Sequence, residues 1–432
     1  MNICVVGVGY VGLVTGTCFA EFGNNVVCVD NDDQKVESLK QGIIPIYEPG
    51  LEEMVKKNQS AKRLHFTTDV AEAVEKSLSI FIAVGTPSNT GGSTNLEYVY
   101  QVAETIGKLM TAYKIVVTKS TVPVGTGKEI KAIILKNQVK EVPFDVVSNP
   151  EFLREGSAIE DFMRPNRVVI GTISEQAIAI MKDLYSPLYL IETPFIITNV
   201  ETAEMIKYAS NAFLATKISF INEMANICEL VGADVHKVAK GMGLDGRIGS
   251  KFLHPGPGFG GSCFPKDTMA IARLAESFGY RFSIVESVIE VNERQYKRMV
   301  DKIENILGNI KGKHLGILGL TFKPKTGDIR ESPAIKIINS LIEKGTSISA
   351  FDPAGMEASK QVLSEIDYVE DMYEVSRDAD ALIIITEWNE FRFPDWEKIK
   401  SLLRSPIIID LRNIYEPDRM RDRGFEYYCV GR

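Results

Sequence analysis

Apolar and polar positions in the first 150 residues follow the pattern of a parallel α/β sheet. An apolar run over residues 2–8 leads through a glycine turn into a helical segment over 13–23 and a second apolar run over 25–30. Further apolar runs, separated by helical segments, lie at residues 78–85, 114–121 and 144–150. Apolar strands that alternate with helices predict a parallel sheet with crossover helices.

Helical periodicity replaces this alternation after Pro194. Residues 201–231 contain no glycine or proline, and their apolar positions recur at helical spacing. Such a helix is ~45 Å long at ~1.5 Å per residue, which indicates a spine between domains or a subunit interface. Helical sequence continues to about residue 307.

A second strand–turn–helix–strand pattern occupies residues 313–353, and later apolar runs lie at 379–386 and 406–413. The sequence therefore predicts an α/β protein in which two Rossmann-like, doubly wound domains are joined by a long central helix and a helical middle domain. The expected parts are an N-terminal nucleotide-binding domain, a central domain at which two copies associate, and a second Rossmann-like domain, over residues 1–198, 199–307 and 308–432.

The composition is that of a globular protein, with 45% hydrophobic and 25% charged residues among 432, and this length fits two or three domains. A net charge of -8 gives no reason to expect nucleic acid or an anionic membrane as a partner. No apolar segment approaches the ~18–20 residues that span a bilayer. Met1 is followed at once by an apolar run, without the basic segment of a secretion signal. We therefore expect a soluble, cytoplasmic protein.

The cysteines and histidines do not occur in metal-binding patterns. The six cysteines form no C-x-x-C pair and the four histidines stand alone, which argues against a zinc site. Disulfides are also unexpected in a reducing compartment. Cys4, Cys18 and Cys28 have apolar neighbours and are interpreted as buried small hydrophobic residues.

The segment GVGYVG fits G-x-G-x-x-G between a strand and a helix. Its glycines allow the backbone to approach a pyrophosphate, and Asp30, at the end of the next strand, can accept a ribose hydroxyl. Because the same carboxylate repels a 2′-phosphate, NAD is favoured over NADP. A tight structural turn and FAD binding are the alternatives. The cofactor contacts expected from this segment come from Gly7, Gly9, Tyr10, Val11 and Gly12.

A second glycine loop, from Gly316 to Lys323, lacks the full fingerprint. It either holds another nucleotide or shapes a domain that binds none. Lys323, Lys325 and Arg330 form a candidate anion site, although three exposed cations on a loop give the same pattern.

Cys263 stands in the segment GFGGSCFPKD, directly before a helical run that contains a proline at its start. Proline suits the first turn of a helix, and a helix N-terminus favours the thiolate form of a thiol. Gly258, Gly260 and Gly261 allow a substrate to approach the backbone. Asp267, about one turn later, can activate a water beside the sulfur. A nucleophilic thiol and a structural thiol both remain open on this pattern.

Other polar residues lie where ligand contacts are common. Lys207 and Asn211 share one face of the predicted long helix, where a cation and an amide can stabilise an oxyanion; a solvated polar stripe is the alternative. Glu151 and Glu155 follow a strand, where Rossmann-type sheets bind ligands, or they cap a helix. Thr121 also ends a strand and can meet cofactor or water.

Together these segments resemble the nucleotide-sugar 6-dehydrogenase family, also called the UDP-glucose/GDP-mannose dehydrogenase family. The resemblance spans residues 7–332 in family order, and the cysteine motif is highly specific. The matching segments are GVGYVG (7–12), EPGL (48–51), VGTP (84–87), KSTVPVGT (119–126), NPEFLREG (149–156), EMIKYASNAF (204–213), GRIGSKFL (246–253), GFGGSCFPKD (258–267) and TFKPKTGDIRES (321–332).

The resemblance implies oxidation of the C6 alcohol of a nucleotide sugar to a carboxylate, with reduction of two NAD. It implies that Cys263 adds to the intermediate aldehyde as a thiohemiacetal, which is oxidised to a thioester that water hydrolyses. A covalent thiol retains the intermediate between the two oxidations. The residues that would stabilise the oxyanions are Lys207 and Asn211, and those that would transfer protons with water are Asp267, Thr121 and Glu151.

The resemblance also implies binding residues. Those near NAD, besides the glycine loop and Asp30, are Lys35, Thr86, Thr121, Glu155, Lys266 and Arg330. Those that contact the sugar nucleotide are Glu151, Phe152, Leu153, Arg154, Glu155, Lys207, Asn211, Phe252, Leu253, His254, Pro255, Gly256, Gly260 and Lys323. Arg247 would reach the substrate of a neighbouring subunit, in line with a dimer along the long helix, and the second Rossmann-like domain would hold UDP.

The sequences of the segments GRIGSKFL and GFGGSCFPKD favour UDP-glucose as the substrate, with UDP-glucuronate as the product, over GDP-mannose or a UDP-N-acetylhexosamine. Base and sugar selectivity do not follow from first principles. A non-catalytic NAD-binding regulator is a further alternative, against which the set of Cys263, Lys207, Asn211 and Asp267 argues.

Overall fold

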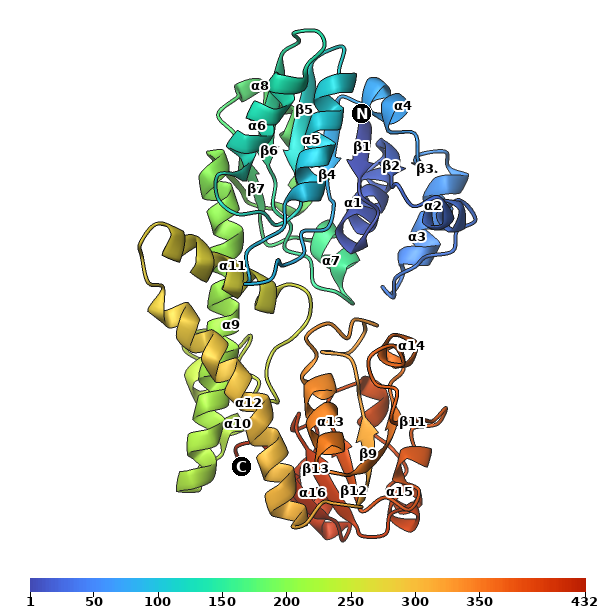
Figure 1. Ribbon diagram of the computed structural model, residues 1–432, viewed down its shortest axis with the longest axis vertical. Helices are drawn as coiled ribbons and strands as arrows, with labels where there is room; N and C mark the ends of the chain where they lie inside the picture. The colour runs from blue at the N-terminus through green and yellow to red at the C-terminus, as the bar shows by residue number, and fades with distance from the viewer. The chain divides into compact units, whose positions relative to one another are not determined.

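The computed structural model describes residues 1–432 and contains two compact units, Met1–Ser210 and Asn211–Arg432. Each unit is built on a sheet of mainly parallel strands with helices around it (Figure 1). The predicted fold class, two Rossmann-like α/β parts and a long helix, is confirmed. The expected domain boundaries at residues 198 and 307 remain predictions.

The sheet of the first unit is 8-stranded, in the order β3-β2-β1-β4-β5-β6-β7-β8. The first six strands follow the 3-2-1-4-5-6 order of a dinucleotide-binding fold, and only β6 and β7 are antiparallel neighbours. The strands are β1 (Asn2–Val6), β2 (Asn25–Val29), β3 (Leu64–Thr67), β4 (Ser79–Ile82), β5 (Lys114–Thr118), β6 (Phe144–Ser148), β7 (Val168–Gly171) and β8 (Phe195–Thr198).

Two apolar cores lie against this sheet. One includes residues of α1, α2, α3, α7 and α8, and the other residues of α4, α5 and α6. Strands buried on both faces read as continuous apolar runs, which is why β1, β4 and β5 are visible in the sequence. The helices are α1 (Tyr10–Glu21), α2 (Asp33–Lys40), α3 (Leu51–Ser60), α4 (Val70–Lys76), α5 (Glu97–Leu109), α6 (Thr126–Asn137), α7 (Ala158–Met163), α8 (Glu175–Leu184), η1 (Ser186–Ile191) and the start of α9 (Val200–Val231).

The sheet of the second unit is 6-stranded and wholly parallel, in the order β11-β10-β9-β12-β13-β14. Renumbered from β9, this is again the 3-2-1-4-5-6 order. The second unit therefore repeats the plan of the first. Its strands are β9 (His314–Leu318), β10 (Ser347–Phe351), β11 (Asp367–Tyr368), β12 (Ala381–Ile384), β13 (Ile407–Asp410) and β14 (Glu426–Cys429).

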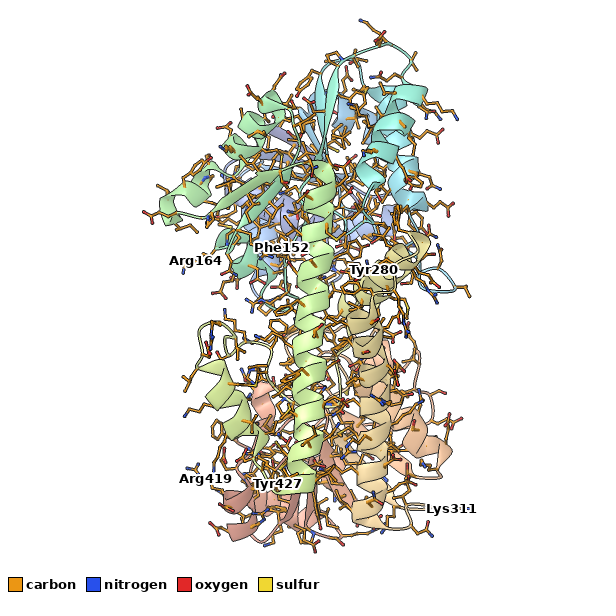
Figure 2. The ribbon with its side chains drawn as sticks, turned by 90° about the vertical axis from the view of Figure 1, so that its left-hand side faces the viewer. Phe152, Arg164, Tyr280, Lys311, Arg419 and Tyr427 are labelled. Atoms are coloured by element: carbon orange, nitrogen blue, oxygen red, sulfur yellow. The ribbon has the colours of Figure 1, made fainter.

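Helices of the second unit cover its sheet on both faces and extend beside it. One core joins the sheet to α12, α13 and the C-terminal half of α9, and another joins it to α15 and α16. Within this unit α9 and α12 run side by side (Figure 2), with Asn226 donating to Gln295 across them at 3.0 Å. The remaining helices are α10 (Val235–Gly243), α11 (Phe264–Ser277), α12 (Ser283–Leu307), α13 (Pro333–Glu343), α14 (Met356–Ser359), η2 (Glu374–Ser376), η3 (Asn389–Phe391), α15 (Trp396–Leu402) and α16 (Pro417–Asp422).

The structure contains neither a cluster of metal-ligating side chains nor a helix that could span a membrane. Histidine, cysteine and acidic side chains nowhere gather in the groups of three that a metal site would need. None of the helices combines the length and the apolar character required to cross a bilayer.

Candidate active site

The first glycine loop connects β1 to α1. Gly7 has a φ of 96°, and its amide donates to the carbonyl oxygen of Val29 at 2.8 Å, which closes the turn beside β2. A Cβ on Gly12 would lie 1.8 Å from the Gly7 carbonyl oxygen, whereas a Cβ on Gly9 would meet nothing within 4 Å. The loop is thus tight around Gly7 and open above Gly9. This arrangement leaves room for a pyrophosphate at the N-terminus of α1.

Asp30 follows β2 and contacts the same loop. Its carboxylate accepts a hydrogen bond from the Val8 amide at 2.8 Å and forms a salt bridge with Lys35 at 3.1 Å. These partners hold the carboxylate where a Rossmann fold binds a ribose. After β4 and β5, Thr86 donates to the carbonyl of Thr121 at 3.1 Å. The predicted cofactor residues of the first unit therefore lie along the ends of adjacent parallel strands.

The segment that follows β6 carries the predicted substrate glutamate. Glu151 is buried, and its two carboxylate oxygens accept from Lys207 Nζ at 2.9 Å and from the Leu153 amide at 2.5 Å. Phe152, labelled in Figure 2, lies 3.5 Å from the guanidinium of Arg167 and 5.4 Å from the ammonium of Lys207, measured to its ring centre. Such cation–π contacts add to the ion pair. Charge and packing together fix the orientation of Glu151.

Glu48, in the EPGL segment, joins the glycine loop to the substrate segment. Its carboxylate accepts from the Tyr10 hydroxyl, from the Gly156 amide at 2.6 Å and from the Ala158 amide at 2.8 Å. Burial and the Glu48 carboxylate raise the pKa of Tyr10, so this hydroxyl remains a donor. Sequence analysis quoted EPGL only as a family match and assigned Glu48 no role.

A buried cation beside Glu151 was also missed. Lys119 is buried and donates to Asn149 Oδ1 at 3.1 Å and to the Tyr185 hydroxyl at 3.3 Å. Burial lowers the pKa of Lys119 to about 8, while Glu151 opposes this shift and Lys207 adds to it. A cavity of about 40 Å³ adjoins these side chains, enough for an ordered water. Sequence position gives no sign that this lysine is buried.

Lys207 and Asn211 lie one turn apart on α9, as predicted. They are 3% and 6% exposed, so the alternative of a solvated polar stripe is wrong. Lys207 pairs with Glu151, and Asn211 Nδ2 donates to Asp267 Oδ2 at 2.6 Å. A buried cation and a buried amide on one helix face provide the electrostatic groups that an oxyanion requires.

Cys263 caps the N-terminus of α11 and is partly buried. The Asp267 amide donates to the Cys263 carbonyl oxygen at 2.8 Å, so the helix begins at the cysteine. Asp267 is 1% exposed and accepts from Asn211 and from Lys266 Nζ, both at 2.6 Å. The hydroxyl of Ser262 lies 3.6 Å from the Cys263 sulfur. Cys263, Lys266 and Asp267 thus lie within the first turn of α11, and the Asn211 amide of α9 binds the buried carboxylate.

The other five cysteines are buried. Burial raises the pKa of Cys4 to about 12 and that of Cys429 to about 11, and it raises the pKa of Cys18 and Cys28 further. These thiols stay protonated and are packing residues, as predicted for Cys4, Cys18 and Cys28. Cys263 differs from all of them in being partly exposed.

The glycines before Cys263 serve chain packing. A Cβ on Gly260 would lie 2.2 Å from the Glu331 carbonyl oxygen, and one on Gly261 would lie 2.7 Å from the ring of Phe322. The Gly261 amide donates to the Arg330 carbonyl oxygen at 2.9 Å. The loop after β9 in the same unit thus occupies the positions that side chains would take here, while the approach of a substrate to this backbone stays a prediction.

The remaining predicted residues divide between surface and interior. Arg154 and Arg247 are exposed and pair with Asp161 and Asp245, at 2.6 and 2.5 Å. Arg330 pairs with its neighbour Asp328. The other partly or fully exposed residues are Glu155, Phe252, His254 and Lys323, and the buried ones are Leu253, Pro255, Gly256 and Gly260.

Arg412 adds a cation that sequence analysis missed. It follows β13, and its guanidinium donates to the carbonyl oxygens of Ile385 at 2.8 Å and Phe322 at 3.0 Å. A Cβ on Gly256 would lie 3.1 Å from Arg412 Nη1. The arginine therefore lies beside two predicted substrate segments. Its position after a strand of a Rossmann-like sheet was the available signal.

The second glycine loop differs from the first. Asp352 follows β10, the position that Asp30 has after β2, but it is fully buried. Its carboxylate accepts hydrogen bonds from the chain itself, namely from the amides of Leu320, Thr321, Ala354 and Gly355 and from the indole of Trp388. No carboxylate is left for a ribose in the manner of the first loop. The second loop is therefore shaped by its own aspartate.

Comparisons with known proteins agree with these features. Sequence models of the UDP-glucose/GDP-mannose dehydrogenase family match its NAD binding domain to residues 1–189, its central domain to 201–294 and its UDP binding domain to 316–417. UDP-glucose 6-dehydrogenase TuaD of Bacillus subtilis (strain 168) is 52% identical over 432 residues, which cover 100% of this chain and 93% of that protein. UDP-glucose 6-dehydrogenase of Rhizobium meliloti (strain 1021) is 51% identical over 437 residues, with 100% of both covered.

A solved structure of a UDP-glucose dehydrogenase from the hyperthermophilic archaeon Pyrobaculum islandicum is also similar. It has a TM-score of 0.92 and 40% identity, over 99% of this chain and 96% of that one. The likeness thus extends over the whole chain in sequence and in fold. With three domain models in order and relatives of this identity, the chain belongs to the UDP-glucose/GDP-mannose dehydrogenase family.

Proposed function

We propose that this chain oxidises UDP-glucose to UDP-glucuronate with two NAD. The observation that carries the proposal is the arrangement at the start of α11, where Cys263 caps the helix and Asp267 is held by Asn211. Membership of a family with NAD and UDP binding domains supplies the reaction class. The relatives about half identical to this chain are named UDP-glucose 6-dehydrogenases, which supports UDP-glucose as the substrate.

The cofactor site fits NAD. The open space above Gly9 and the N-terminus of α1 suit a pyrophosphate. Asp30 suits a ribose with both hydroxyls and repels a 2′-phosphate, while Lys35 neutralises part of its charge. We assign Thr86, Thr121, Glu155, Lys266 and Arg330 to the same cofactor. Bound NAD supplies the hydride acceptor for both oxidations.

In the first oxidation the C6 carbon gives up a hydride and its hydroxyl gives up a proton, so that an aldehyde forms. Lys207, already held at 2.9 Å from Glu151, stabilises the negative charge that develops on the sugar oxygen. Asp267, Thr121 and Glu151 with water take up the proton. Uptake of the hydroxyl proton by Glu151 or Asp267 costs little reorganisation, because both buried carboxylates are already held by hydrogen bonds.

In the second oxidation the sulfur of Cys263 forms a bond to the aldehyde carbon, the carbonyl π bond opens, and the thiol proton is transferred to the oxygen. The resulting thiohemiacetal again gives up a hydride from carbon and a proton from oxygen, which leaves a thioester. Water then attacks the thioester, releases the thiol and gives the carboxylate. Asn211 donates to the oxyanion, and Asp267, to which it is hydrogen-bonded at 2.6 Å, accepts protons.

We assign substrate contacts to two groups of residues. The segment from Glu151 to Glu155, with Lys207 and Asn211, faces the sugar, because its carboxylate and its cation are the groups fixed for chemistry. The second Rossmann-like sheet holds UDP, with the cations Lys323 and Arg412 near Phe322. The other assigned contacts are Phe252, Leu253, His254, Pro255, Gly256 and Gly260.

We further propose that two copies associate along α9. Phe213, Phe220 and Ile227 are 64%, 49% and 49% exposed and recur every seventh residue, which places them in one stripe. A second copy of the same helix is a partner of matching shape and chemistry, because isologous association lets the stripe cover itself. Arg247, whose side chain is exposed, reaches the substrate of the partner in this dimer. The proposed location is the cytoplasm.

A product assay with separate sugar nucleotides tests the proposal. Purified protein, NAD and UDP-glucose, GDP-mannose or UDP-N-acetylglucosamine are incubated in parallel, and products are identified by mass spectrometry. We expect UDP-glucuronate from UDP-glucose at a kcat/KM at least 100-fold above the others. Absence of acid from UDP-glucose contradicts the proposal, and faster oxidation of another sugar nucleotide replaces its substrate.

A further inference from the structure

The loop that leads to Cys263 is held by side chains of α12. Asn292 forms a two-point contact with Phe259: its Oδ1 accepts from the Phe259 amide at 2.8 Å and its Nδ2 donates to the Phe259 carbonyl oxygen at 3.0 Å. One turn later on α12, Gln295 donates to the carbonyl oxygen of Gly256 at 2.9 Å. Residues 255–261 are buried and belong to no strand or helix, so these side-chain amides satisfy backbone groups whose burial would otherwise be costly.

The same loop is fixed on its other side. The Gly256 amide donates to Asn222 Oδ1 of α9 at 2.8 Å, and Asn226 of α9 donates to the side chain of Gln295. Gly258 has a φ of 120°, and a Cβ there would lie 2.9 Å from Asn292 Oδ1. The glycine thus permits the close approach of the Asn292 amide. Of this cluster only Gly256 is among the residues assigned to the substrate; the side chains of Asn222, Asn226, Asn292 and Gln295 are assigned to neither NAD, sugar nor proton transfer.

Phe259, which Asn292 binds, also contacts the residue that follows Cys263. The ring of Phe259 packs edge-on against Phe264, with centroids 6.0 Å apart and planes at 89°. Phe264 is the first residue of α11 and follows Cys263. Phe259 therefore contacts the first residue of α11, next to the cysteine that caps the helix.

We propose that Asn292 is a positioning residue: it holds the loop before Cys263 so that the sulfur is placed for addition to the aldehyde. The proposal rests on the function proposed above, in which the sulfur takes part in the second oxidation and not in the first. Loss of the Asn292 amide should therefore slow the sulfur-dependent half of the reaction more than the first hydride transfer. A displacement of ~1 Å at a reacting group costs ~100-fold in rate.

The test compares Asn292→Ala with Arg294→Ala, a control on the same helix whose side chain is exposed and makes ion pairs no shorter than 3.6 Å. Three quantities are measured: NADH formed per UDP-glucose consumed, the amount of released aldehyde that semicarbazide traps, and the rate of alkylation of Cys263 by iodoacetamide between pH 7 and 9. Alkylation reports selectively on Cys263 because the other five thiols are buried.

For Asn292→Ala we expect NADH per UDP-glucose to fall from two toward one, trapped aldehyde to appear, and alkylation to change at least 3-fold. Arg294→Ala should match the wild type in all three. A ratio that stays at two, with kcat lowered or not, overturns the proposal because it shows no step-specific effect. Should Asn292→Ala fail to fold, Asn292→Asp, which keeps the acceptor for the Phe259 amide and removes the donor, is held to the same outcomes.

The wild-type ratio separates this inference from the proposed function. Absence of acid in the wild type removes the function and, with it, the role of Asn292. A wild-type ratio of two together with a ratio of two in both Asn292 variants removes only the role of Asn292.

Discussion

Substitution of the buried Lys119 by methionine should remove a pH-dependent part of the stability of the first unit. Burial lowers the pKa of Lys119 to about 8 from an ordinary 10.5. At ~1.4 kcal/mol per pKa unit, the charged form costs the folded state about 3 kcal/mol relative to the unfolded chain. Below pH 8 both states carry the proton, and the folded state bears this cost in full. Between pH 8 and 10.5 the folded state loses the proton first, so its free energy of unfolding rises with pH.

Thermal unfolding of wild type and Lys119→Met at pH 7, 8, 9 and 10, at one ionic strength, measures this term. The wild type should gain about 2–3 kcal/mol relative to the variant across this range, or about 4–12 °C in Tm for a unit of this size. The hydrogen bonds that methionine cannot make to Asn149 and Tyr185 add an offset that does not depend on pH. The slope is therefore the test, and Tm curves that run parallel from pH 7 to 10 refute the reasoning.

Three further outcomes follow from the site and the loops. Lys207→Met leaves the buried carboxylate of Glu151 without its ion pair, so the free energy of unfolding measured in urea should fall by about 3–5 kcal/mol. Steady-state assays should show a loss of about 100- to 1,000-fold in kcat, and a variant as active as wild type argues against an oxyanion role. Gly261→Ala meets an aromatic ring at a φ of 82° and should lose at least ~1–2 kcal/mol, whereas Gly85→Ala, where a Cβ meets nothing within 4 Å, should unfold like wild type. Asp30→Ala should weaken NADH binding and narrow the preference for NADH over NADPH in titrations; an unchanged preference would mean that another group reads the ribose.

The sequence predicted the elements whose signals are local. β1, β4 and β5 are continuous apolar runs, and the helix entry at Cys263 carries its proline and its glycines. β7 and β8 were missed. β8 has two exposed isoleucines and so lacks the continuous apolar run of a buried strand, whereas β7 is buried and as long as β4, so the burial of β7 gives no such reason. The family resemblance then located the candidate site residues.

Long-range packing accounts for the rest. Gly260 and Gly261 were interpreted only as room for a substrate, whereas the distant residues Glu331 and Phe322 explain why no side chain fits at these positions. In the sequence Lys119 looks like an ordinary polar residue at the end of a strand, although the fold buries it near Glu151. Asn292 lies in a charged stretch of α12 that gives no sign of its contact with the cysteine loop. Such contacts depend on where distant elements meet, which local patterns do not encode.

The covalent role of Cys263 is tested by counting NADH against UDP-glucose in wild type and in Cys263→Ser. Wild type should form two NADH and one UDP-glucuronate for each UDP-glucose consumed. Cys263→Ser should bind NADH with unchanged affinity, because the glycine loop and Asp30 are intact, and should form no UDP-glucuronate. Undiminished formation of the acid by Cys263→Ser, or a wild-type ratio of one, would contradict a mechanism in which the sulfur carries the aldehyde through the second oxidation.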